Sequence, residues 1–209
     1  MTRHCSAVVG LVSSAVIAQA AHASSLGTIF SNVEFGNADI PSSIITDIFS
    51  VNLPFAVGAQ AVVTGTFFMH RLDQPPGFGV DTLVPVDFTA YCVEIGDEIL
   101  DPGVHDVCNL LGSTTNPGGI SGPVFFDAVR TKALQRLWGG FQSMVVDNVS
   151  SGAFQLAIWE LTFDTDMTLV DPSGTTPFYV AAGQFQPGIT DVAEGWLAAV
   201  RSSDPLPET

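Results

Sequence analysis

The spacing of hydrophobic residues changes once along this chain of 209 residues, near residue 124, and this change constrains the fold most. Before it, runs rich in Val, Ile, Thr and Phe are separated by Gly, Pro and Asn, which is typical of strands and turns. After it, apolar residues recur at helical spacing. With no repeat and no long linker, this pattern predicts one α+β domain. We expect an antiparallel β-rich N-terminal half, sandwich or barrel-like, packed with about three helices from the C-terminal half.

Three segments carry the helical spacing: 124–141 (VFFDAVRTKALQRLWGGF), 150–161 (SSGAFQLAIWEL) and 190–203 (TDVAEGWLAAVRSS). Gly139 and Gly140 are expected to end the first helix. Ser150 or Ser151 is the expected N-cap of the second. Gln155 then lies near a helix start. There its polar side chain either caps a backbone N–H group or takes part in a covalent bond.

The first 23 residues have the pattern of a signal peptide. Arg3 precedes the apolar run SAVVGLVSSAVIAQA, and Ala21–Ala23 (AHA) supply the small residues of a cleavage site. This favours a signal peptide over a membrane anchor, so the mature chain starts near Ser24 and Cys5 is removed. We expect a secreted or cell-surface protein, and no later stretch is long enough to span a membrane.

The charge excludes some classes of function. Six basic residues against 21 acidic ones give a net charge of −15, which is incompatible with the basic footprint of a nucleic-acid-binding protein. The chain has no G-x-S-x-G, P-loop or H-E-x-x-H motif. We therefore expect no turnover enzyme and no cofactor.

Acidic residues cluster in two places without the D-x-D-x-D-G pattern of a calcium loop, so we expect them to be solvated and predict no metal site. These residues are Glu94, Asp97, Glu98, Asp101, Asp164 and Asp166.

Two short motifs occur in a fixed order. Tyr91-Cys92 lies in TAYCVEIGDE, and Gln155 opens a Q-x-A-I-W segment that ends at Trp159. In these motifs the chain resembles the bacterial thioester-domain family. The segments ALQRLWGGFQ and AFQLAIWEL also resemble secreted proteins of the PEP-CTERM type, and the final PLPET is similar to the cut edge of a sorting signal.

The resemblance implies a single thioester-like domain over 24–204, followed by a tail at 205–209. It implies an intramolecular thioester between the sulfur of Cys92 and the side chain of Gln155, with Tyr91, Trp159 and Glu94 in support. Such a bond is single-use covalent chemistry. It would attach the protein to an amine or hydroxyl of a host or matrix protein or polysaccharide, as in adhesion or anchoring to an extracellular matrix.

A second interpretation remains open because the mature chain has two cysteines. Cys92 and Cys108 lie 16 positions apart, and in an oxidising compartment they could form a disulfide. That disulfide would make the thioester impossible. The protein would then be a non-covalent structural or polysaccharide-associated extracellular protein of the same fold.

Overall fold

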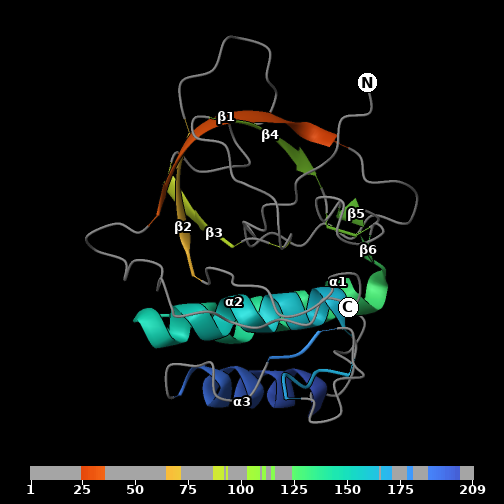
Figure 1. Cartoon of the computed structure of the whole chain (residues 1–209). Helices are drawn as coiled ribbons and strands as arrows, with labels where there is room; N and C mark the ends of the chain where they lie inside the picture. The colour runs from red at the N-terminus through yellow and green to blue at the C-terminus, as the bar shows by residue number, and fades with distance from the viewer. Residues whose placement is uncertain are drawn as a thin grey trace.

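The computed structural model of the chain has short strands in its N-terminal half and three α-helices in its C-terminal half (Figure 1). The structure describes residues 25–35, 65–71, 87–91, 93, 103–108, 110–111, 114–115, 124–164, 166–170, 178–180 and 188–202. The predicted signal peptide, the C-terminal tail, Cys92 and Glu94 lie outside the described residues.

Four of the strands pair in the order β3-β2-β1-β4, and every neighbouring pair is antiparallel. Two further strands, β5 and β6, pair with each other. The strands are β1 (Ser25–Phe35), β2 (Phe67–Arg71), β3 (Asp87–Ala90), β4 (Gly103–Cys108), β5 (Thr114–Thr115) and β6 (Val124–Phe125).

The register brings one end of β2 and one end of β3 together. Phe67, the first residue of β2, pairs with Ala90, the last residue of β3. Thr66 directly precedes β2 and Tyr91 directly follows β3, so these two residues leave the sheet at the same end.

The helices are α1 (Ala128–Phe141), α2 (Asn148–Phe163) and α3 (Ile189–Ser202), with a short 3₁₀ helix, η1 (Gln142–Met144), after α1. The carboxylate of Asp127 caps α1 by accepting the amide hydrogen of Arg130 at 2.8 Å. The predicted end of this helix at Gly139 and Gly140 is wrong, since α1 continues to Phe141. Both glycines are exposed, and helix interiors tolerate glycine at a cost of about 1 kcal/mol.

The second helix begins earlier than predicted. Its N-cap is Asp147, whose side chain accepts the backbone N–H of Ser150 while the Ser150 hydroxyl accepts the backbone N–H of Asp147. This reciprocal pair is a capping box. Ser150 and Ser151 therefore lie inside the helix, and Gln155 lies two turns from its start.

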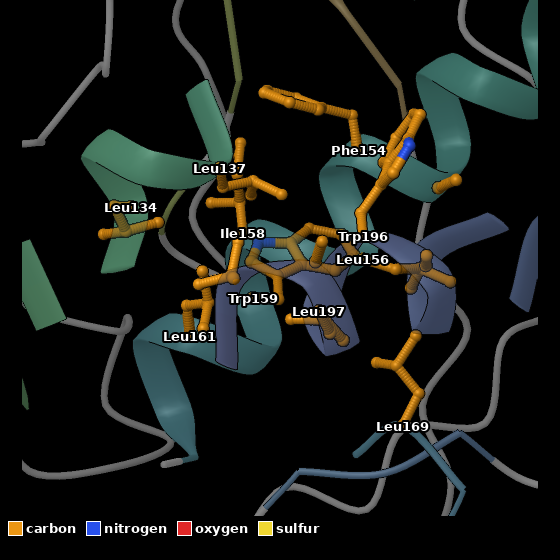
Figure 2. Close-up of a cluster of buried hydrophobic side chains, with 14 of the residues drawn as sticks. Leu134, Leu137, Phe154, Leu156, Ile158, Trp159, Leu161, Leu169, Trp196 and Leu197 are labelled. Carbon is orange, nitrogen blue, oxygen red and sulfur yellow. The ribbon is translucent and has the colours of Figure 1, made fainter. Parts of the chain in front are cut away.

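Helix α2 is buried on all sides. Every residue from Ser150 to Phe163 is buried, as expected for a helix that is apolar around its whole circumference. Figure 1 shows α2 beside α1, with α3 on one side and the strands on the other. Figure 2 shows the core where the three helices meet, with side chains from α1, α2, α3 and the loop residue Leu169.

Helix α3 buries one stripe against α2. The stripe consists of Ala193, Trp196, Leu197 and Val200, all of which are buried. The helix begins at Ile189.

The predicted fold class is wrong. We expected an antiparallel β-rich half, sandwich or barrel-like, but the described part of the chain is mostly helical and contains neither. Apart from β1, only short pieces of the apolar runs before residue 124 are described as strands, and the described strands form neither a closed barrel nor two facing layers. The described hydrophobic core belongs mainly to the helices.

Among the described residues, no helix is both long enough and apolar enough to cross a membrane.

The capping box generates a stability prediction. Replacing Asp147 with alanine removes the acceptor for the Ser150 amide, so the free energy of unfolding should fall by about 1 kcal/mol in urea denaturation. Asp147→Asn keeps an acceptor and should lose less. Equal stability of the wild type and Asp147→Ala would contradict the assigned helix start.

Candidate functional site around helix α2

The ends of β2 and β3 are joined to α2 by three buried hydroxyl groups, those of Thr66, Tyr91 and Ser151. The Thr66 backbone N–H donates to Ser151 Oγ at 3.0 Å, and Thr66 Oγ1 lies 2.7 Å from the same Ser151 oxygen. Thr66 Oγ1 donates to Tyr91 Oη at 2.9 Å. These bonds join segments 85 positions apart in sequence, so they fix how the strand ends lie on the helix.

Because the Thr66 hydroxyl donates its one hydrogen to Tyr91 Oη, the hydrogen between Thr66 Oγ1 and Ser151 Oγ comes from Ser151. Burial raises the pKa of Tyr91 above its ordinary value of 10.0, although hydrogen bonds with Thr66 and Ser151 partly oppose this effect.

The Tyr91 ring packs directly on the residue before Gln155. Its centroid lies 4.9 Å from that of Phe154 and 6.0 Å from that of Trp138, in an edge-on arrangement with the latter. Trp138 and Phe154 also contact each other at 5.6 Å, and Phe154 contacts Trp196 of α3 at 5.9 Å. Aromatic pairs of this kind contribute about 1 kcal/mol each beyond the area they bury.

Gln155 is 1% exposed and lies four residues, or one helical turn, after Ser151. The two side chains therefore share the face of α2 that Thr66 and Tyr91 contact. Our expectation that Gln155 lies beside the unpaired N–H groups of a helix start is wrong, because those groups belong to the turn that follows Asp147. Gln155 also cannot be the capping residue of α2, because the N-cap is Asp147.

Trp159 lies one turn beyond Gln155 and is 3% exposed. Within the described part of the chain its indole Nε1 has no hydrogen-bond acceptor. The same helix buries Ala157 completely. The surroundings of Gln155 along α2 are therefore dry.

Cys92 lies outside the described residues, as do Glu94, Asp97 and Glu98. The residues on either side of Cys92 are described, and both Tyr91 and Val93 are buried. The other cysteine, Cys108, is the last residue of β4 and pairs with Ser25 of β1.

A second group of polar residues lies at the far end of α2. One carboxylate oxygen from each of Glu160, Asp164 and Asp166 lies within 4.8 Å of the others. Glu160 and Asp164 are buried, and Asp166 is exposed. We had expected Asp164 and Asp166 to be solvated, but burial and proximity to Glu160 distinguish Asp164 from a surface acid.

The segment after α2 folds back over the Glu160 carboxyl group. The Thr168 backbone N–H donates to Glu160 Oε1 at 3.0 Å and also to Asp166 Oδ1 at 2.8 Å. The Asp166 N–H donates to Asp164 Oδ1 at 3.1 Å. Met167 adopts a positive φ of 60° at this reversal.

This concentration of acids raises the pKa of Glu160 to about 9. Burial is the main cause, and the negative charges of Asp164 and Asp166 add to it. The Thr168 amide opposes the shift but does not cancel it.

Sequence reasoning missed Thr66, Ser151 and Glu160 as site residues. Thr66 and Ser151 are brought together only by the fold. Glu160 and Asp164 carry a signal that the sequence does contain, since acids four residues apart on a helix share a face.

No protein-family model matches the chain, and neither a curated protein nor a solved structure was found that is significantly similar to it.

The raised pKa of Tyr91 predicts how the stability of the protein depends on pH. The folded protein keeps the Tyr91 proton at pH values where the unfolded chain, with its pKa near 10.0, has lost it. The free energy of unfolding should therefore decrease as the pH rises above about 10, and phenolate absorbance from Tyr91 should appear only with unfolding.

The Tyr91→Phe variant is the control, because the chain has only one other tyrosine, Tyr179. This variant should lose that part of the pH dependence. Ionisation of Tyr91 at or below pH 10 in the folded protein would contradict its burial among the aromatic rings.

Proposed function

We propose that the chain is an exported surface or matrix protein that forms an intramolecular thioester between Cys92 and Gln155 and uses it once to attach to a partner. The partner would be a host or matrix protein or polysaccharide that offers an amine or a hydroxyl group. The observation that carries the proposal is the contact of Tyr91 with Phe154, because these residues directly precede Cys92 and Gln155.

The chemistry balances without a cofactor. The Cys92 sulfur attacks the carboxamide carbon of Gln155, the C–S bond forms, and the C–N bond breaks. The thiol proton leaves with the nitrogen as ammonia. An incoming amine or hydroxyl later attacks the same carbon, the C–S bond breaks, and the Cys92 thiol is regenerated while an amide or ester to the partner remains.

The surroundings of Gln155 support this reaction in two ways. Burial excludes the water that would hydrolyse a thioester, and Trp159 covers the next turn of the same helix face. A donor is also needed for the negative charge that develops on the carbonyl oxygen. The helix start is too distant to supply it, so we assign this role to the hydroxyl of Tyr91, whose ring contacts Phe154, the residue before Gln155.

The strand register favours the thioester over a disulfide between Cys92 and Cys108. Ala90 pairs with Phe67, which in turn pairs with Phe35 at one end of β1. Cys108 pairs with Ser25 at the other end of β1. Ten residues of strand span about 34 Å at 3.4 Å per residue. Although β1 curves, Figure 1 shows its two ends well apart.

A disulfide requires Cα atoms no more than about 7 Å apart. Ala90 and Cys108 lie at opposite ends of β1, and Cys92 follows Ala90 by two positions in the sequence. The alternative function, a non-covalent structural protein held by that disulfide, therefore receives no support from the sheet.

Intact-mass measurement of freshly purified, non-reduced protein tests the proposal. We expect a mass lower than the sequence mass by one ammonia. Methylamine should remove the deficit and become attached to Gln155, because it opens the thioester.

The matched controls are the two cysteine variants. Cys92→Ala should show no ammonia deficit and no methylamine adduct, whereas Cys108→Ala should behave like the wild type. An unmodified amide at Gln155, or a loss of two hydrogens that a reductant restores, would refute the thioester.

A further inference from the structure

We propose that Glu160, Asp164 and Asp166 bind one divalent cation of the calcium type at the C-terminal end of α2. This site is separate from the Cys92 and Gln155 pair, and the proposal does not depend on the thioester.

The first argument is the geometry of the ligand atoms. The three carboxylate oxygens lie within 4.8 Å of one another. Calcium binds oxygen atoms at about 2.3–2.6 Å, so two ligands on opposite sides of one ion are about 4.8 Å apart. A single ion can therefore contact all three oxygens without a large movement. Carboxylates are also the ligands that hard divalent cations prefer.

The second argument is an unsatisfied oxygen on Glu160, one of the three residues of the cluster. Glu160 is completely buried, and within the described part of the chain its Oε2 has no hydrogen-bond partner. A buried carboxylate oxygen without a partner costs free energy. A cation bound there would satisfy Oε2, while Oε1 is held by the Thr168 amide.

The third argument concerns charge. The residues from Glu160 to Val170 include three acids and no lysine or arginine. Three carboxylates whose oxygens lie within 4.8 Å of one another repel each other when they are ionised. A divalent cation would offset that repulsion.

The neighbouring helix α3 holds the loop that follows α2 in place. Glu194 of α3 accepts the backbone N–H groups of Leu169 at 2.6 Å and Val170 at 3.2 Å. The Arg201 guanidinium donates to the Met167 carbonyl at 3.2 Å. The loop that carries Asp166 is therefore held against α3, and the exposed Asp166 gives an ion a route from solvent.

The rival explanation is a proton. Glu160 could remain protonated and donate a hydrogen bond to Asp166, which would also satisfy Oε2. In that case no ion binds, so a binding measurement distinguishes the two.

Calorimetric titration of CaCl₂ into the full chain, after treatment with a chelator and dialysis, tests the proposal. We expect one calcium ion per chain. Asp166→Asn should weaken binding by at least about tenfold, since calcium affinity depends on the number of charged ligands. Asp166 is exposed, so this variant should fold. Glu160→Gln keeps an acceptor for the Thr168 amide and should weaken binding as well.

The matched control is Asp191→Asn, which removes the same charge from an exposed residue in the first turn of α3. This variant should bind calcium like the wild type. The absence of calcium binding by the wild type, or equal binding by Asp166→Asn, would overturn the proposal.

Discussion

The burial of α2 from Ser150 to Phe163 is the constraint on which the rest of the described structure depends. A helix with no solvent-facing side must have each of its polar side chains satisfied by the protein or by a ligand. Thr162 meets this requirement within the helix by donating to the Ile158 carbonyl at 2.7 Å. Ser151 meets it through Thr66, and Glu160 meets it only in part. The two candidate sites are the two places where α2 carries polar groups into the core.

This constraint also joins the two halves of the chain. The hydroxyl groups of Thr66 and Tyr91 reach α2 from adjacent strand ends, and the Tyr91 ring enters the aromatic cluster formed by Trp138, Phe154 and Trp196. The hydrogen bonds specify position, and the ring contacts supply the stabilisation. The segment that ends at Tyr91 is therefore held against the helix that carries Gln155.

Helical periodicity in the sequence predicted the three helices, because an apolar spacing of three to four residues persists through each segment. It did not predict their ends. Serines at 150 and 151 are good capping residues, but Asp147 with Ser150 forms a capping box that moves the start, and with it the position of Gln155 within the helix. The strand-like runs in the first half suggested a sandwich or barrel, which was wrong, because alternation along a strand does not specify whether a sheet closes or acquires a second layer.

Part of the candidate site was predictable from the motifs, because Tyr91, Gln155 and Trp159 lie in recognisable segments. The partners Thr66 and Ser151 were not predictable, since a hydrogen bond across 85 positions leaves no pattern in the sequence. Glu160 was overlooked for a different reason. Acidic residues near a helix end are usually solvated, and only the fold of the loop back over the helix shows that this one is enclosed.

The central claim is that Cys92 lies within bonding distance of position 155, and a disulfide-trapping experiment measures this directly. In a Gln155→Cys variant that also carries Cys108→Ala, mild oxidation should join Cys92 to the introduced thiol, because the two Cα atoms would lie within about 7 Å. Peptide mapping should find that cross-link in protein whose circular dichroism retains the helical signal. Two freely alkylated thiols in the folded, oxidised protein would contradict the account.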